Sequence, residues 1–202
     1  MPDIIVSVDG AKIIADFYKN SKEMLDGTTV ILATSIHPDV VEQCIEGGAK
    51  IKWVQPFFNF DSHKEYFRKG IPSIKMGGNV GTASYLITSL VLKAKHIGLI
   101  GIEFAWSDET PYSSTQYYDE LMDVLDKKYE EVEKHFVHIK NQRDGKTYMA
   151  DPVYYAYFLM LKEIWDELPL DIKEKTYNLT KAGILDLNNL KSINIEEFMR
   201  IR

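Results

Sequence analysis

A glycine-rich stretch in the middle of the chain has the residue types that bind anionic groups. Its polar and small members are Gly77, Gly78, Asn79, Gly81 and Thr82. Glycines let backbone N–H groups approach an anion, and the N-terminus of a following helix adds a favourable dipole. The spacing is neither that of a Walker loop nor G-x-G-x-x-G. The stretch therefore predicts a nucleotide or phosphate contact, with a plain glycine turn before a helix as the alternative.

Two acidic residues stand at the ends of apolar, β-branched runs. Asp9 follows the run 3–8, and Glu103 lies near the end of the run 96–104. Ligands of parallel sheets bind at the carboxyl ends of the strands, where an acid can meet a ligand hydroxyl or a magnesium ion. We expect both acids at one edge of one sheet. A solvated turn or a helix cap is the alternative for each.

His138 is the histidine best placed for general base catalysis, because it precedes the turn-forming segment 141–145. No histidine has metal-ligand spacing, and no metal site is predicted. The single cysteine, Cys44, excludes an internal disulfide and favours a structural role and a reducing, cytoplasmic location.

Aromatic residues are dense in two stretches of the chain, and rings in loops at a sheet edge could stack on a base or a pterin. These are Trp53, Phe57, Phe58, Phe60, Tyr66, Phe67, Trp106, Tyr112, Tyr117 and Tyr118. The aromatic residues of the stretch 154–165 have helical spacing and are expected in the core.

The composition is that of an ordinary soluble globular protein: 202 residues, 45% hydrophobic and 27% charged. We expect no membrane span and no signal peptide. A net charge of -6 argues against nucleic acid as a partner. A homo-oligomer is left open.

The order of elements predicts an α/β fold. Strands are expected at 3–8, 28–34, 50–54 and 96–104, helices at 11–25, 37–48, 82–93, 116–135 and 151–168, a long loop with a short helix at 55–78, and a hairpin turn at Asp144-Gly145. This βαβαβ order favours a Rossmann-like parallel sheet of five or six strands with helices on both faces. We expect a single domain, 1–202, with a core at 1–148 and a helical extension at 149–202.

Four segments in this order carry a resemblance to a known family: "PDIIVSVDG", "GGNVGTASYLITSLVLKAKHIGLIGIEFAW", "PYSST" and "KTYNLTKAGIL". Together they resemble the MptE-like family, which covers archaeal 6-hydroxymethyl-dihydropterin diphosphokinases and motility-associated factor (Maf) flagellin glycosyltransferases. The middle segment also resembles a bacterial sialyltransferase family that uses CMP-sialic acid, which implies a sialyltransferase-like fold.

The resemblance assigns roles by position. Gly81 and Thr82 fall where those sialyltransferases touch the nucleotide, and Asp9 falls near it as well. Trp106 and Tyr112 match two tyrosines that hold the leaving phosphate, with Trp106 lacking the hydroxyl. His138 falls near the histidine that acts as base.

The resemblance implies a nucleotide-dependent transferase, with glycosyl transfer from a CMP-type nucleotide-sugar as the leading expectation. The alternative is a pterin diphosphokinase that uses ATP and magnesium, in which Asp9 and Glu103 would serve magnesium and phosphate. Family members usually begin with a strand and a "G-x-G-P-S-L" loop, which this chain, starting at Met1, lacks. A truncated or non-catalytic nucleotide-binding protein is therefore a further alternative.

Overall fold

The computed structural model describes residues 2–57 and 67–201, and the chain forms two compact units, Met1–Lys93 and Ala94–Arg202. Phe58, Phe60, His63 and Tyr66 lie outside the described residues. We expected the chain to subdivide after residue 148, whereas its contacts divide it at residue 93. Whether the two units make one domain stays a prediction, and each is described by itself.

The first unit contains a four-stranded parallel sheet in the order β1-β2-β3-β4. Its strands are β1 (Ile4–Ser7), β2 (Thr29–Ala33), β3 (Lys50–Pro56) and β4 (Ser73–Ile74). The first three are where the β-branched runs predict them. The short β4 lies in the stretch expected to be a loop. It pairs in parallel with β3, with Ser73 opposite Gln55.

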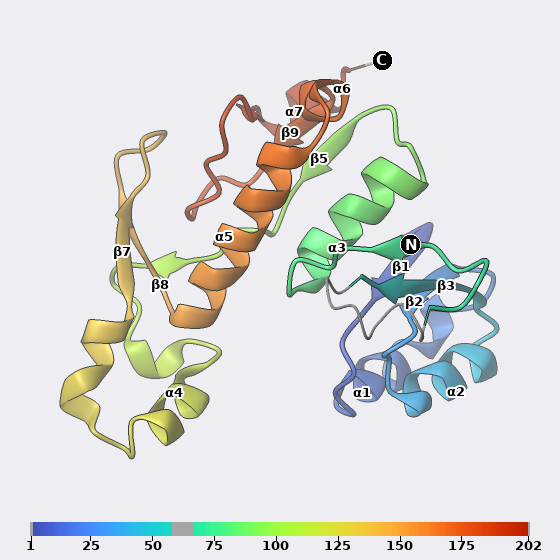
Figure 1. The fold of residues 1–202 in the computed structure, drawn as a ribbon, viewed down its shortest axis with the longest axis horizontal. Coiled ribbons are helices and arrows are strands. Elements are labelled where there is room, and N and C mark those ends of the chain that lie inside the picture. Colours follow the sequence, from blue (N-terminus) through green and yellow to red (C-terminus); the bar gives the residue numbers. More distant parts are fainter. Residues whose placement is uncertain (1, 58–66, 202) are drawn as a thin grey trace. The chain divides into compact units, whose positions relative to one another are not determined.

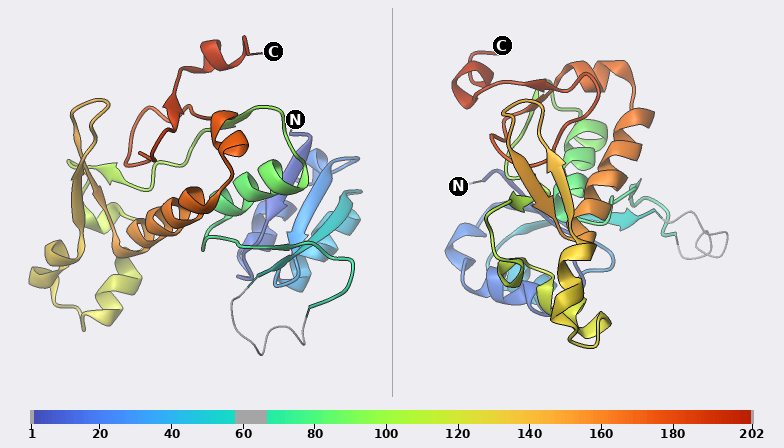
Figure 2. Two further views of the ribbon diagram at one scale, coloured as in Figure 1. Left: turned by 45° about the horizontal axis from the view of Figure 1, so that its top comes forward. Right: turned by 90° about the vertical axis from the view of Figure 1, so that its left-hand side faces the viewer.

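Helices cover both faces of this sheet, as Figures 1 and 2 show. They are α1 (Ile14–Lys19), the 3-10 turn η1 (Lys22–Met24), α2 (Pro38–Glu46), α3 (Val80–Leu86) and the π-helical turn η3 (Ile87–Val91). Helices α1 and α2 pack together on one face, and α3 packs against β1 on the other. The predicted α/β, Rossmann-like fold is confirmed, but among the described residues this parallel sheet has four strands instead of the expected five or six.

The core between the sheet and α2 explains why Cys44 is not a reactive residue. Cys44 and Val40 of α2 are fully buried with Val30 and Leu32 of β2. Burial raises the pKa of the Cys44 thiol to about 11, so the nucleophilic thiolate is disfavoured. Its role is packing.

The second unit contains two further sheets. One is parallel, in the order β10-β9-β5, with β5 (Ile97–Leu99), β9 (Thr176–Asn178) and β10 (Lys191–Ser192). The other is antiparallel, in the order β6-β8-β7, with β6 (Trp106–Ser107), β7 (Val137–Lys140) and β8 (Thr147–Ala150).

The expectation that the strand after the glycine helix joins the first sheet was wrong. Strand β5 pairs with β9 in the described part of the chain, through bonds such as Leu179 N–H to the Leu99 carbonyl at 2.8 Å. It is also shorter than predicted, because Gly101 adopts a φ of +73° and turns the chain out of the strand.

The helices of the second unit are α4 (Tyr118–Val124), α5 (Pro152–Glu167), α6 (Leu170–Glu174) and α7 (Ile195–Phe198), with 3-10 segments η4 (Tyr112–Ser114) and η5 (Tyr129–His135). The single helix expected at 116–135 was wrong. Asp126 and Lys127 both have positive φ, +51° and +61°, and two left-handed residues end an α-helix. No described helix is long and apolar enough to cross a membrane.

The predicted hairpin at Asp144-Gly145 joins β7 to β8 and is confirmed. Gly145 has a φ of +72°, and the Asp144 carboxylate accepts from the Tyr148 hydroxyl at 2.6 Å and from the Lys146 N–H at 2.9 Å. The C-terminal segment also binds to the hairpin: the Asn141 amide donates a hydrogen bond to the Gly183 carbonyl at 2.7 Å.

We predict that Gly183→Ala lowers the free energy of unfolding by about 3 kcal/mol, because a Cβ at a φ of +85° would overlap the Glu103 backbone, 2.7 Å from its Cα. Gly145→Ala is the matched control: its φ is also positive, but a Cβ there meets nothing within 4 Å, so strain alone should cost about 1 kcal/mol. Urea denaturation measures both. Equal losses would contradict the close packing of Gly183 on Glu103.

We predict that Tyr148→Phe destabilises the protein near neutral pH and much less in acid. The Tyr148 hydroxyl bond and the Lys146 N–H hold the pKa of Asp144 below its ordinary 3.8. A lowered pKa in the folded state stabilises the fold above the unfolded pKa, and this stabilisation is lost as the pH falls through the folded value. Denaturation of wild type and variant near neutral pH and well below 3.8 measures it. The change in stability caused by the control Tyr118→Phe should be the same at both pH values. An equal loss of stability at both pH values in Tyr148→Phe would refute the prediction.

Candidate functional site

The glycine stretch forms the predicted turn into a helix. Gly77 and Gly78 have φ of +62° and +76°, which a residue with a side chain rarely adopts. Asn79 follows as the N-cap of α3, and its side chain accepts from the Thr82 N–H at 2.9 Å. Gly81 lies in the first turn of the helix.

The polar side chains of this turn serve the turn itself. The Asn79 amide donates to the Gly77 carbonyl and to the Thr82 hydroxyl oxygen, both at 3.0 Å. Thr82 is fully buried. The predicted contact of Thr82 with a nucleotide is therefore not through an exposed hydroxyl. The backbone of Gly78, which is exposed, and of the half-buried Gly81 is what a ligand could approach.

Asp9 lies just past the carboxyl end of β1, as predicted. It is exposed, and its carboxylate accepts from the Ala11 N–H at 2.8 Å. The turns after β1 and β2 are adjacent there, since the Ser35 hydroxyl donates to the Val8 carbonyl at 3.4 Å and a Cβ on Gly10 would lie 2.8 Å from the Ser35 carbonyl oxygen. Asp9 therefore lies at the carboxyl-end edge of the parallel sheet, where the ligands of such sheets generally bind.

Glu103 does not share that sheet. It follows β5, and β5 and β1 belong to different sheets and different compact units. The expected placement of both acids at one edge of one sheet was therefore wrong, and the roles of Glu103 and Asp9 stay separate predictions. The backbone of Glu103 has a structural role, because its carbonyl accepts a hydrogen bond from the Ile184 N–H at 2.9 Å.

The antiparallel sheet of the second unit brings two predicted residues onto one face. Trp106 of β6 and His138 of β7 are both direct partners of Met149 on the central strand β8. Directly opposed residues in adjacent strands point to the same side of a sheet. Trp106 and His138 thus flank the buried Met149 on one face of the sheet.

A carboxylate that the sequence did not single out completes this face. The Asp108 Oδ1 lies 2.6 Å from the His138 Nδ1, with 45% and 39% of the two side chains exposed. Burial, followed by the charges of Glu133 and Asp108, raises the pKa of the Tyr112 hydroxyl, and the Tyr112 ring packs against Phe136 with centroids 4.7 Å apart. The structure thus pairs Asp108 with His138.

Trp106 is fixed from the opposite side by the start of α5. Its indole N–H donates to the Asp151 carboxylate at 3.2 Å, and its ring stacks on Tyr154 with centroids 5.4 Å apart and planes 5° from parallel. Tyr117 and Tyr157 extend this aromatic group, with hydroxyls 3.3 Å apart. Asp151 had a signal in the sequence, an acid directly before Pro152 at a helix start, whereas Asp108 had none.

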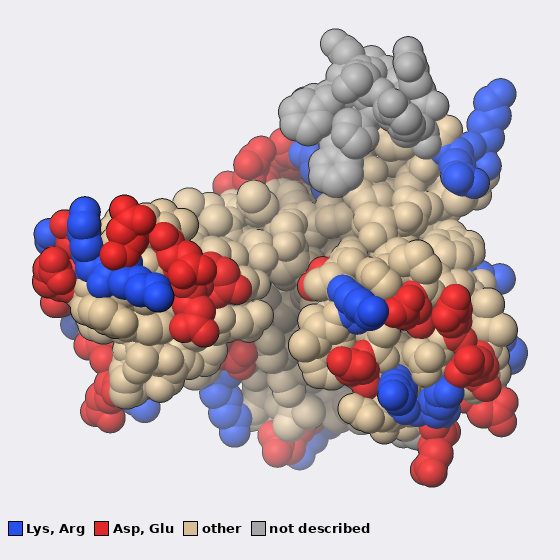
Figure 3. All heavy atoms as spheres, turned by 90° about the horizontal axis from the view of Figure 1, so that it is seen from below, with Lys and Arg blue, Asp and Glu red and all other residues tan. Residues whose placement is uncertain are grey.

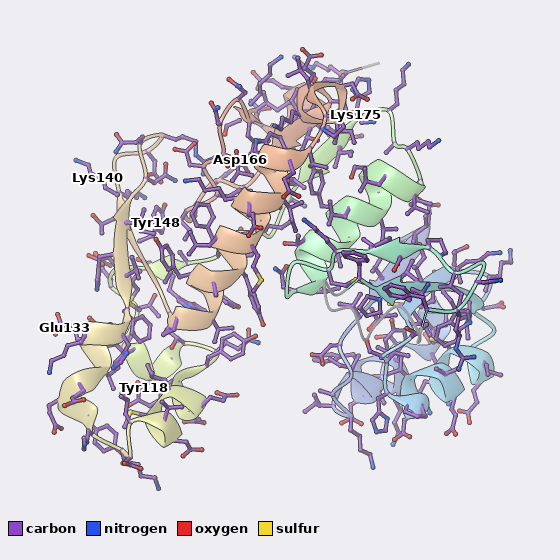
Figure 4. The ribbon with its side chains drawn as sticks, in the orientation of Figure 1. Tyr118, Glu133, Lys140, Tyr148, Asp166 and Lys175 are labelled. Atoms are coloured by element: carbon purple, nitrogen blue, oxygen red, sulfur yellow. The ribbon has the colours of Figure 1, made fainter. Side chains whose placement is uncertain are left out.

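The surface around α4 and η5 is acidic. Figure 3 shows Asp and Glu gathered there, and Figure 4 shows Glu133 at the η5 end of β7, away from Lys140. The acids of the first turns are Asp119, Glu120, Glu130 and Glu131. Carboxylates beside Tyr112 oppose the approach of a phosphate. The contact of Tyr112 with the leaving phosphate stays a prediction.

Two other features of the described residues bear on ligands. No group of three or more His, Cys, Asp or Glu among them could hold a metal ion. In the first unit an open groove of about 400 Å³ runs between β1 and the α3–η3 helix, lined by Asp3, Ile4, Val6, Ser84, Thr88 and Leu92. Its lining is not that of the glycine turn.

Comparison with known proteins gives one finding. The model of the family described as 6-hydroxymethylpterin diphosphokinase MptE-like matches residues 1–109, a span that contains the glycine turn, Asp9 and Asp108. No curated protein and no solved structure matches the chain. The match covers more than half of the 202 residues, and the chain belongs to the MptE-like family.

Proposed function

We propose that the protein is a nucleotide-dependent transferase that moves a sugar from a CMP-type nucleotide-sugar to a hydroxyl group of an acceptor. Family membership supports a transferase. The observation that carries the proposal is the paired His138 and Asp108, because a histidine hydrogen-bonded to a carboxylate through Nδ1 is the arrangement of a general base.

The proposed transfer is a single displacement. The His138 Nε2 takes the proton of the acceptor hydroxyl while the acceptor oxygen forms a bond to the anomeric carbon of the sugar. The bond between that carbon and the phosphate oxygen breaks, and CMP leaves with the electron pair. A base of this kind contributes roughly 10²–10⁴-fold to the rate.

The glycine turn is the proposed contact for the donor. Gly78 and Gly81 carry no side chain that would block a phosphate or ribose, and the N-terminal turn of α3 presents backbone N–H groups. Asp9, at the edge of the same unit, is the proposed partner of a ribose hydroxyl. The two assignments concern the first unit, the base concerns the second, and each is tested by itself.

A second candidate is a diphosphokinase, which the description of the family favours. There the acceptor oxygen would attack the β-phosphorus of ATP, the bond from that phosphorus to the oxygen bridging the α-phosphorus would break, and AMP would leave. Magnesium would arrive with ATP as part of the substrate, with Asp9 and Glu103 as separate candidates to contact it. A protein that binds a nucleotide without turnover is the third reading.

We predict that Gly81→Val abolishes nucleotide binding, because its side chain would occupy the space that a phosphate or ribose needs. Isothermal titration calorimetry with CMP, CDP, and ATP with magnesium measures this, and the nucleotide that binds selects between the two reactions. Ser84→Val, one turn further along α3, is the control and should bind as wild type does. Equal affinity in wild type and Gly81→Val would remove the glycine turn from the site.

We predict that His138→Ala lowers turnover by roughly 10²–10⁴-fold and leaves donor affinity nearly unchanged, because a base acts in the transition state. Release of CMP or AMP in the presence of acceptor measures turnover. Lys140→Ala, two residues further along β7, is the control variant. Unchanged turnover in His138→Ala would rule out this histidine as the base.

A further inference from the structure

We infer that Asp108 is a positioning residue that fixes the tautomer of His138, with the proton on Nδ1 and the lone pair on Nε2. This inference rests on the proposed function for its catalytic meaning, but the tautomer itself can be observed without any substrate.

The separation of the two side chains is set by backbone pairing. Asp108 follows β6 directly, His138 is the second residue of β7, and both strands are hydrogen-bonded to β8. Strand β6 is held in turn by Trp106, whose indole is bonded to Asp151 and stacked on Tyr154. The carboxylate is thus presented to the imidazole by a fixed segment.

The chemistry of the two groups decides the direction of the bond. An ionised carboxylate only accepts hydrogen bonds, so at 2.6 Å the His138 Nδ1 is the donor. In a neutral imidazole the other nitrogen, Nε2, then has no proton and can take one. The side chain of His138 is 39% exposed, so this face of the second unit is accessible to an acceptor hydroxyl.

Asp108 also has a role after the proton has moved. When Nε2 has taken the proton, the imidazolium keeps its Nδ1–H bond to the carboxylate, and its new charge lies beside a negative one. In this role the Asp108 carboxylate accepts the Nδ1–H bond both before and after the proton transfer. Without it, the imidazole could place its proton on Nε2, which is the wrong tautomer for a base.

The first experiment reads the tautomer directly. Long-range ¹H–¹⁵N NMR correlation of neutral His138 should show Nδ1–H as the major form in wild type. Asp108→Ala and Asp108→Asn should lose this preference, and Asp108→Glu should recover part of it. Glu109→Gln, the same change of charge one residue along the chain, should behave as wild type. An unchanged tautomer in Asp108→Ala would overturn the inference.

The second experiment tests the consequence for turnover. Asp108→Asn should lower kcat by roughly 10²-fold or more and leave KM for the donor nearly unchanged, with partial recovery in Asp108→Glu. The two experiments fail separately. If Asp108→Ala shifts the tautomer of His138 but the wild-type protein has no transferase activity, the positioning role is supported and the proposed function is refuted. Normal kcat in Asp108→Asn would refute the positioning role while leaving the function standing.

Discussion

The second unit is organised around one buried carboxylate, that of Asp151, which is 1% exposed. A buried charge is tolerated only when donors surround it, and Asp151 has three: the N–H groups of Val153 and Tyr154, at 3.0 and 2.8 Å, and the Trp106 indole, at 3.2 Å. These bonds start α5 directly after β8 and tie β6 to the same point. The face that carries His138 depends on this arrangement, because β8 is the strand to which both β6 and β7 are paired.

The glycine turn of the first unit and the surroundings of Tyr112 in the second unit differ in charge. The glycine turn offers backbone N–H groups at a helix start, which favour an anion. The surroundings of Tyr112 are acidic: burial, and after it the charges of Glu133 and Asp108, raise the pKa of its hydroxyl. An acidic setting opposes a phosphate but stabilises a histidine that gains a positive charge as it removes a proton.

The family match and the geometry support different residues. The match ends at residue 109, so it includes Asp9, the glycine turn, Glu103 and the β6 segment that presents Asp108. His138 lies beyond it. The structure adds to the sequence-based case for His138, because a residue inside the matched span, Asp108, is hydrogen-bonded to this residue outside it. The pair links the family portion of the chain to the portion that follows.

The sequence by itself determined the elements whose signals are local. β-Branched runs located β1, β2 and β3, because the preference of such side chains for an extended backbone is local. Pro38 and Pro152 marked the starts of α2 and α5, and Asp144-Gly145 marked the hairpin, because helix starts and tight turns depend on residues near in sequence. Only the tertiary structure decided the partner of β5, the break between α4 and η5, and the approach of Asp108 to His138. Strand pairing is a choice among distant segments with similar edges, and a left-handed pair without glycine, as at Asp126, has no pattern of its own. The sequence could thus offer His138 as a base, but its orienting partner, 30 residues away, became visible only when β8 was placed between them.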